Sequence, residues 1–527
     1  MNQKLLNKLQ CWPYLLGLVL GLYFMILNVT GIDFCYLPGD LGDGRFNTYI
    51  LEHAHQYFSG NLDSFWSAPF MHPEKEIITF SDNLLGTAPL YSIFRVFGAD
   101  IFTAFQLWFV LIAILNYSTG YLFLNWLLKN RYAAVLGAFV FAFSLALQSQ
   151  IAHAQTFPRF FIPLAIWMSL LFMQELKPKF FFLTLFFTVM QFYSGIYLGF
   201  MLTIPLIFLF LIILIKKRKE LFQHLKQWKW ILKILVAISI NALLLQVLMT
   251  PYYNRSIQVG ENLFENVLHT VPLFKSYLFA QPGSPIWTFL RGVGVELQAS
   301  WDHHLFTGGI SVLSLLSFFV LITFRKKLKL QSLISNNVAI LALIGLLTFL
   351  SVIRINEHTL YRLFFNLPGF GSMRAITRII NIELLFFGLA VAVVSLLILN
   401  RFVKFKTPIF LIMIGLLTFD NYFTEGSSYR IEKKEAKVRL STLQDKMKNI
   451  PAGAIVSYEP LERDYNVYVY QIDAMLAAQS LGLKTVNGYS GNSPGAYQSF
   501  WHEMSESGRI SWFESLNFKP KKVYVIH

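Results

Sequence analysis

Long apolar runs recur along most of the chain, and most of them approach the length that a helix needs to cross a bilayer. About 20 apolar residues span the roughly 30 Å hydrocarbon core. Only 14% of the 527 residues are charged, whereas a soluble protein carries about 25%. We therefore predict an α-helical polytopic membrane protein and exclude a soluble enzyme. The predicted spans, about eleven in number, lie near 12–32, 104–128, 132–150, 160–175, 180–194, 196–215, 231–250, 308–324, 337–353, 379–400 and 407–423.

The net charge of +15 is distributed unevenly between the loops. Basic clusters between the apolar runs, together with two lysines at the start, hold 20 of the 44 Lys and Arg residues. Basic loops stay on the cytoplasmic side, so spans that start inside place every cluster in the cytoplasm and the C-terminus outside. The basicity thus indicates topology, and we expect no nucleic-acid partner. The basic residues concerned are Lys4, Lys8, Lys129/Arg131, Lys177/Lys179, Lys216 to Lys219 with Lys226, Lys229 and Lys233, Arg325 to Lys329, and Arg401/Lys404/Lys406.

The same alternation leaves long segments on the outer side, and these are 33–103, 251–307 and 354–378. From about residue 425 the composition changes to that of a soluble, charged protein. We therefore divide the chain into a transmembrane domain, 1–424, and a small extracytoplasmic α/β domain, 425–527. The patterns that predict the α/β domain are strands at 454–458 and 521–526, a helix at 473–481 and a turn-rich loop at 487–494.

The first outer loop opens with Pro38-Gly-Asp-Leu-Gly-Asp-Gly-Arg45, a glycine-rich turn that contains the carboxylates of Asp40 and Asp43. Carboxylates at a membrane boundary are costly unless they are paired, solvated or bound to metal. One interpretation is a general base or a set of metal ligands at the lip of a cavity. The other is a solvated loop, in which Asp stabilises turns. Further candidate side chains of this loop are Glu52, His53, His72 and Asp82.

The outer loop that precedes the span at 379–400 carries two arginines. Arg374 and Arg378 are four residues apart, so they project from one face of the helix start. Two guanidinium groups at a helix N-terminus make a favourable phosphate site. The alternative is that both arginines extend to lipid headgroups. The segment from His153 to Arg159, between the third and fourth spans, can line the same cavity.

Taken together, these motifs resemble the GT-C superfamily of membrane glycosyltransferases, which are polytopic and use lipid-linked sugars. The resemblance rests on a large first outer loop with an acidic motif directly after the first span, and Asn487-Gly-Tyr-Ser490 is similar to the corresponding segment of YfhO-like bacterial membrane proteins. The family often has adjacent acids, whereas two residues separate Asp40 from Asp43 here, which leaves open which of them is catalytic. The other matching stretches are Gly39 to Arg45, Glu52-His53, Ser81 to Gly86, His153 to Arg159 and Pro368 to Arg378.

The resemblance implies transfer of a sugar from a polyprenyl-phosphate donor to a lipid, glycan or protein acceptor on the outer face of a bacterial inner membrane. Asp43 or Asp40 would deprotonate the acceptor hydroxyl for in-line attack, with inversion. Members of the family work with and without metal, so the cofactor is left open between none and a divalent cation. The residues implied for the donor phosphate are Arg374, Arg378 and Arg159, and those for the surrounding site or a cation are His53, Glu52, His72 and Asp82.

Two other functions fit the same membrane body. A transporter or flippase for lipid-linked glycan intermediates would use an intramembrane charge such as Glu383 along its path. Transporters often show internal repeats and interrupted helices, and neither is evident in the sequence. A scaffolding protein would keep the fold without activity. Substitution of Asp43 and Asp40 separates the enzyme from both alternatives, because only the enzyme loses transfer.

Overall fold

Helices make up most of the chain, for which the computed structural model describes residues 11–260, 262–424 and 430–527. The predicted basic residues Lys4 and Lys8 and the predicted boundary at 425 lie outside these ranges. Each predicted span coincides with a helical segment. Within the described residues, seven segments are long and apolar enough to cross a membrane. The helical membrane class is confirmed, while the number of spans stays a prediction.

The segments that correspond to the predicted spans are as follows in chain order. They are α2 (Trp12–Gly21) continued by η1 (Leu22–Ile26) and α3 (Leu27–Thr30), α6 (Ile101–Leu128), α7 (Arg131–Phe143) with η3 (Leu145–Gln150), α8 (Phe161–Glu175), α9 (Pro178–Ser194), α10 (Ile196–Lys216), α12 (Trp228–Val259), α14 (Gly309–Thr323), α15 (Asn336–Val352), α17 (Ile380–Arg401) and α18 (Lys406–Asp420).

Capping side chains fix where several helices begin. Asp100 precedes α6, and its Oδ1 accepts hydrogen bonds from the backbone N–H groups of Phe102 at 3.1 Å and Thr103 at 3.2 Å. Asn130 caps α7 in the same way, with a bond from Ala133 at 3.1 Å. These oxygens satisfy N–H groups that lack a partner within the helix. The short connection between α6 and α7 makes the two helices antiparallel neighbours.

Glycines let two central helices pack closely. A Cβ built on Gly137 of α7 would lie 2.4 Å from the carbonyl oxygen of Gly388 in α17, and one on Gly388 would lie 2.4 Å from the oxygen of Gly137. Without an apolar driving force between helices in lipid, such close approach through small residues is a main source of association. Both helices are almost wholly buried, so the pair forms the centre of the membrane body.

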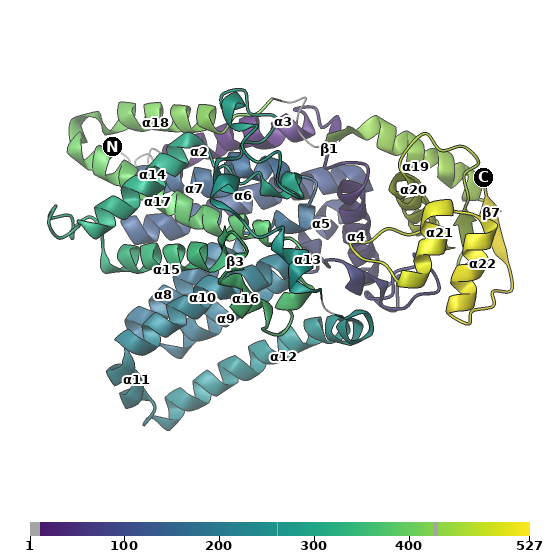
Figure 1. Ribbon diagram of the computed structural model, residues 1–527, viewed down its shortest axis with the longest axis horizontal. Coiled ribbons are helices and arrows are strands. Elements are labelled where there is room, and N and C mark those ends of the chain that lie inside the picture. Colours follow the sequence, from purple (N-terminus) through teal and green to yellow (C-terminus); the bar gives the residue numbers. More distant parts are fainter. Residues whose placement is uncertain (1–10, 261, 425–429) are drawn as a thin grey trace.

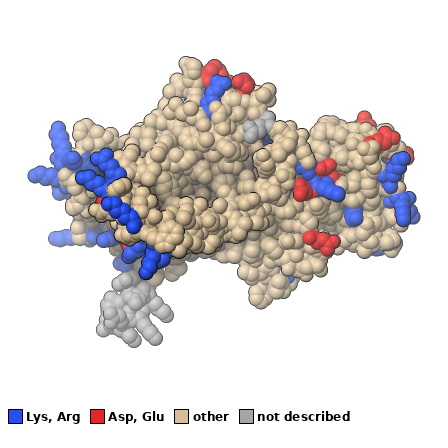
Figure 2. Space-filling model, turned by 90° about the horizontal axis from the view of Figure 1, so that it is seen from below, with Lys and Arg blue, Asp and Glu red and all other residues tan. Residues whose placement is uncertain are grey.

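The membrane body has two chemically different ends. Figure 1 shows the long helices running beside one another, with the C-terminal helices and strand β7 (Val523–Ile526) at one end of the long axis. Figure 2 shows many Lys and Arg side chains and hardly any acidic ones at the opposite end, whereas the C-terminal end carries side chains of both signs. This separation agrees with basic cytoplasmic loops. Helix α12 lies at the lower side of the bundle in Figure 1. Only 17% of its apolar stretch is buried, as expected for a helix that faces lipid.

The C-terminal region contains the predicted α/β elements. Its parallel sheet has the order β6-β5-β7, and its helix α20 begins six residues before the predicted start at 473. Strand β4 (Arg430–Glu432) pairs antiparallel with β1 (Tyr36–Pro38) of the first loop, so the region is joined to the membrane body by a ladder. Its other elements are α19 (Lys433–Met447), β5 (Ile455–Tyr458), α20 (Val467–Ser480), β6 (Lys484–Thr485), α21 (Gln498–Glu503) and α22 (Glu506–Ser515).

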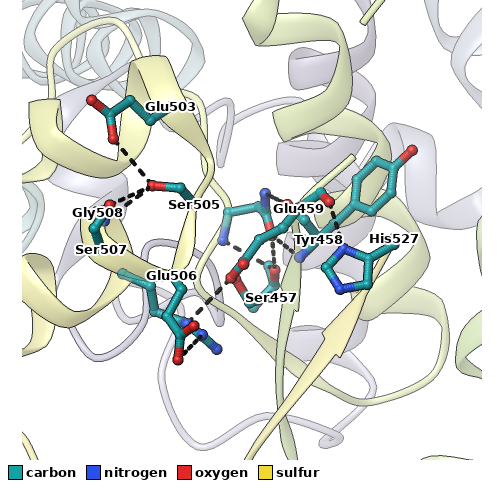
Figure 3. Close-up of polar contacts among 12 residues, drawn as sticks. Ser457, Tyr458, Glu459, Glu503, Ser505, Glu506, Ser507, Gly508 and His527 are labelled. Atoms are coloured by element: carbon teal, nitrogen blue, oxygen red, sulfur yellow. Dashed lines mark hydrogen bonds and ion pairs between the residues drawn. The ribbon is translucent and has the colours of Figure 1, made fainter. Parts of the chain in front are cut away.

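A buried carboxylate joins the ends of two neighbouring strands, β5 and β7, to helix α22 (Figure 3). Glu459 follows β5, and its Oε1 accepts a hydrogen bond from Ser457 Oγ at 2.6 Å and pairs with Arg509 Nε of α22 at 3.2 Å. Its backbone oxygen lies 2.9 Å from Nδ1 of His527, the last residue. These contacts fix the end of β7 and the face of α22 against β5.

A second buried ion pair joins the C-terminal region to the first loop. Arg45 is 2% exposed, and its Nη1 pairs with Asp473 of α20. Arg45 Nη2 also donates to the carbonyl oxygen of Val469 at 3.1 Å, and Arg439 of α19 donates to Asp473 Oδ2 at 2.5 Å. The single carboxylate of Asp473 thus serves two guanidinium groups from different parts of the chain.

We expect Asp473→Ala to lower the free energy of unfolding by about 3–5 kcal/mol, because it leaves Arg45 buried without a counter-charge. Thermal unfolding of the full-length protein in lipid nanodiscs measures the effect. The matched control is Asp445→Ala, which breaks an exposed pair with Lys448 and should cost less than about 1 kcal/mol. Equal, small effects of the two substitutions would contradict the role assigned to the buried pair.

Candidate active site

The glycine-rich turn of the first loop places two carboxylates at the start of helix α4 (Asp43–Phe58). Gly39 has a φ of +98°, and a Cβ on Gly44 would lie 2.9 Å from the Cα of Gly39, so both glycines are required by this close turn. Asp40 Oδ1 accepts backbone hydrogen bonds from Gly42 at 3.0 Å and Gly44 at 3.4 Å. The N-terminal end of a helix favours negative charge, which suits both carboxylates.

Asp43 accepts hydrogen bonds from two distant parts of the chain. Its Oδ2 lies 2.8 Å from Nδ1 of His153, and its Oδ1 accepts a hydrogen bond from the hydroxyl of Tyr489. Because an ionised carboxylate has no proton to give, Nδ1 of His153 is the donor. The side chains of Asp43 and His153 are each 25% exposed, so the pair borders solvent at this end of the molecule.

The two carboxylates differ in their acidity. Burial by itself raises the pKa of Asp43, but the hydrogen bond and charge of His153, the bond from Tyr489 and the charge of Arg378 outweigh it and hold the pKa below its ordinary value. Burial and then the charge of Asp43 raise the pKa of Asp40 above its ordinary value. Neighbouring acids with pKa values moved apart in this way are a feature of many functional sites. Asp43 is therefore the stronger acid of the two.

Arg378 and Asp82 form the other side of the site. The guanidinium of Arg378 lies over the ring of Tyr197, 4.6 Å from its centroid, and its charge acts on both Asp43 and Asp82. Arg378 Nε and Asp82 Oδ2 are buried and have no hydrogen-bond partner among the described residues. The other oxygen of Asp82 accepts bonds from the backbone N–H groups of Ile196 at 2.9 Å and Asn83 at 3.1 Å. Buried polar groups normally have partners, so these two atoms are suited to hold a ligand.

Arg374 connects this side of the site to the C-terminal region. Its Nη2 donates to the carbonyl oxygen of Gly491 at 2.6 Å, and its backbone N–H donates to the hydroxyl of Tyr197 at 2.9 Å. The side chain is exposed. The structure thus brings together five of the predicted residues, which are Asp40, Asp43, Asp82, Arg374 and Arg378.

Four other predicted residues lie elsewhere. Arg159 is fully buried between the rings of Phe141 and Phe157, and its Nη1 donates to Asn381 at 3.1 Å. The structure therefore gives it the contacts of a packed core residue. Glu52 and His53 lie further along α4 and His72 lies beneath the C-terminal region, and none of the three contacts Asp43.

These three residues have local structural partners. Glu52 pairs with Arg95 at 2.7 Å. Burial lowers the pKa of His53 to about 4, and its Nε2 lies 2.7 Å from the carbonyl oxygen of Phe65. Burial likewise lowers the pKa of His72 to about 4, and its ring packs against Phe518. Both histidines are therefore neutral near pH 7.

Two residues of the site had only weak signals in the sequence. His153 belongs to a stretch that can line the cavity, yet nothing in its spacing indicates contact with Asp43. Tyr489 lies in the turn-rich loop at 487–494, and its hydroxyl reaches Asp43 across 446 residues of chain. Only the docking of the C-terminal region creates that contact.

The residues around Asp43 do not make a metal-ligand set. Within the described ranges, no group of three or more His, Cys, Asp or Glu side chains is placed to hold a metal ion. Both oxygens of Asp43 already accept hydrogen bonds, and the Asp40 oxygen accepts bonds from its own turn. The arrangement fits proton transfer by a carboxylate supported by histidine and tyrosine.

Comparison with known proteins gives a fold but no family. The sequence matches no protein-family profile and no curated protein. The fold is similar to that of the oligosaccharyltransferase of Archaeoglobus fulgidus, in its apo form, with a TM-score of 0.50 and 14% sequence identity. The similarity covers 97% of this chain and 69% of the archaeal one. The predicted resemblance to GT-C proteins is therefore confirmed for the fold.

Asp82 yields a prediction about pH. Burial raises its pKa to about 6 in the folded protein, above the ordinary 3.8. The folded state therefore prefers the protonated form, and ionised Asp82 costs stability, increasingly as pH rises from about 4 to 6. We expect Asp82→Asn to raise the free energy of unfolding by roughly 2 kcal/mol at pH 7.5 and to change it little at pH 4.

The midpoint of thermal unfolding, followed from pH 4 to pH 8, tests this prediction. Asp63→Asn changes an exposed carboxylate of the same loop and serves as the control, with little effect at any pH. The prediction is wrong if Asp82→Asn shifts the midpoint equally at both ends of the range.

Proposed function

We propose that this chain is a membrane glycosyltransferase that moves a sugar from a polyprenyl-phosphate donor to an acceptor hydroxyl, with inversion, on the outer face of a bacterial cytoplasmic membrane. The observation that carries the proposal is the ionised carboxylate of Asp43, held by His153 and Tyr489 and facing the charge of Arg378. A base and an anion site side by side are the two elements that such a transfer needs. The similarity in fold to an oligosaccharyltransferase supports the same class of reaction.

The base acts on the acceptor. As the acceptor oxygen attacks the anomeric carbon it becomes positively charged, and its pKa falls far below that of a free alcohol. A carboxylate of low pKa such as Asp43 can then take the proton, provided that it is correctly positioned. His153 fixes the orientation of the carboxylate. Asp40, whose Oδ1 is engaged by the backbone of its own turn, shapes that turn.

The cationic side acts on the leaving group. The bond between the anomeric carbon and the phosphate oxygen breaks as the new bond forms, and polyprenyl phosphate departs as an anion. Arg378, with its buried Nε free of a protein partner among the described residues, and Arg374 stabilise that charge. Asp82 lies beside Arg378 and has an oxygen available for the sugar hydroxyls.

The location is supported by the distribution of charge. The site lies at the end of the molecule that carries the C-terminal region, opposite the end where Lys and Arg gather (Figure 2). If the basic end faces the cytoplasm, the site opens on the outer side. The exposed apolar helix α12 provides a lipid-facing surface along which a polyprenyl chain can lie.

The first test of this proposal is donor cleavage by the purified protein. The full-length chain in lipid is incubated with a panel of radiolabelled polyprenyl-phosphate sugars together with acceptor extracts, and release of polyprenyl phosphate is measured. We expect Asp43→Asn to slow turnover about 10²- to 10⁴-fold, because an amide cannot take the proton. Asp63→Asn is the control. A folded wild-type protein that cleaves no donor would contradict the proposal and favour a transporter of lipid-linked glycans.

A second test concerns the phosphate. We expect Arg378→Ala to raise KM for the donor about 10- to 100-fold, since one charge-assisted hydrogen bond contributes about 1.5–3 kcal/mol. Arg378→Lys keeps the charge but loses the planar guanidinium group, so its KM should lie between those of the wild type and Arg378→Ala. Arg362→Ala removes an exposed arginine of the same outer loop and should leave KM unchanged. Equal KM values for all three variants would remove Arg378 from the donor site.

A further inference from the structure

The hydroxyl of Tyr489 sits on Asp43 in the way that an acceptor hydroxyl does in base-assisted transfer. It donates to Oδ1, while His153 holds Oδ2 at 2.8 Å. A substrate hydroxyl that binds Oδ1 therefore competes with the Tyr489 hydroxyl for the same carboxylate oxygen. The position of the Tyr489 hydroxyl therefore indicates where the acceptor hydroxyl would bind Asp43.

The backbone around Tyr489 is anchored independently of that hydroxyl. The N–H of Gly488 donates to Gln471 Oε1 at 3.0 Å. On the other side, Gly491 accepts the bond from Arg374 at 2.6 Å, and the N–H of Asn492 donates to the carbonyl oxygen of Phe80 at 3.1 Å. These backbone bonds hold the loop in place when the hydrogen bond from the Tyr489 hydroxyl to Asp43 is broken.

Two further aromatic rings lie beside that of Tyr489. The ring of Tyr489 lies 6.2 Å from that of Tyr468 on α20 and 6.0 Å from that of Trp501 on α21, and all three side chains are partly exposed. The electron-rich faces of such rings attract the C–H groups of a pyranose ring. Next to Tyr489, Ser490 has a buried Oγ without a hydrogen-bond partner among the described residues, which suits a polyhydroxylated ligand.

We propose that Tyr468, Tyr489 and Trp501 form the acceptor subsite, that the acceptor is a carbohydrate, and that its attacking hydroxyl replaces the Tyr489 hydroxyl on Asp43. This inference rests on the proposed function for the role of Asp43 and adds the class of acceptor. The acceptor oxygen bonds to the anomeric carbon as the bond to phosphate breaks. Its proton passes to Asp43, and polyprenyl phosphate leaves.

Binding of simple glycosides tests the subsite without a donor. Methyl β-glucoside, methyl α-mannoside and methyl β-galactoside are titrated against the full-length protein in nanodiscs, with saturation-transfer NMR as the readout. Tyr489→Phe keeps the ring and removes the competing hydroxyl, so at least one glycoside should bind about three- to tenfold more tightly. The Trp501→Ala variant should bind the glycosides about tenfold more weakly than wild type. The ring compound 2-methoxytetrahydropyran, which has no hydroxyl groups, should not compete with the glycosides for binding.

The control is Tyr465→Phe, the same change at an exposed tyrosine of the same region, with unchanged affinity. Thermal unfolding verifies folding, and Trp501→Phe replaces the alanine variant if that variant fails to fold. The inference is overturned if no glycoside binds, if Tyr489→Phe binds no more tightly than wild type, or if Trp501 variants bind normally. Donor cleavage by wild type without any such binding would overturn the subsite alone, whereas glycoside binding without cleavage of any donor would overturn the proposed transfer.

Discussion

The buried ion pair between Arg45 and Asp473 is the contact on which the geometry of the site depends. Arg45 follows Asp43 by two residues on α4, and Asp473 lies on α20, ahead of the loop that carries Tyr489. This pair tolerates little displacement, because separation leaves Arg45 without a counter-charge in a low-dielectric interior. The pair therefore sets the C-terminal region against the first loop, and the bond from Tyr489 to Asp43 is a consequence of that docking.

Electrostatics then divides the roles of the two acids in the turn. Asp43 has a histidine and a tyrosine as donors and an arginine nearby, and these outweigh burial and lower its pKa. For Asp40, burial and the like charge of Asp43 outweigh the backbone donors and raise the pKa. Both sit at one helix N-terminus, yet only side chains from distant segments distinguish them. The two acids of one turn thus have different environments, and the proposed base is the one with the side-chain donors.

The membrane body and the outer loops contribute different things. The body is built by packing of small and apolar residues, as at Gly137 and Gly388, and it resembles that of an oligosaccharyltransferase in fold. One fold can occur in proteins that act on many different substrates, and the residues of the site decide which substrate is used. Here that site lies where the first loop, the segment at His153, the start of α17 and the C-terminal loop meet, and its aromatic edge is what suggests a sugar as acceptor.

The sequence by itself determined the membrane class, the positions of the apolar helices and the short strands near 454–458 and 521–526. It also predicted nine candidate site residues, of which Asp40, Asp43, Asp82, Arg374 and Arg378 lie together and Arg159, His53, Glu52 and His72 lie elsewhere. These follow from hydrophobic length, periodicity and local turn chemistry, which nearby residues settle. Only the tertiary structure decided that His153 and Tyr489 join Asp43 and that Arg159 packs in the core. Those contacts span more than a hundred residues of chain, and no local pattern records a proximity that the docking of separate elements creates.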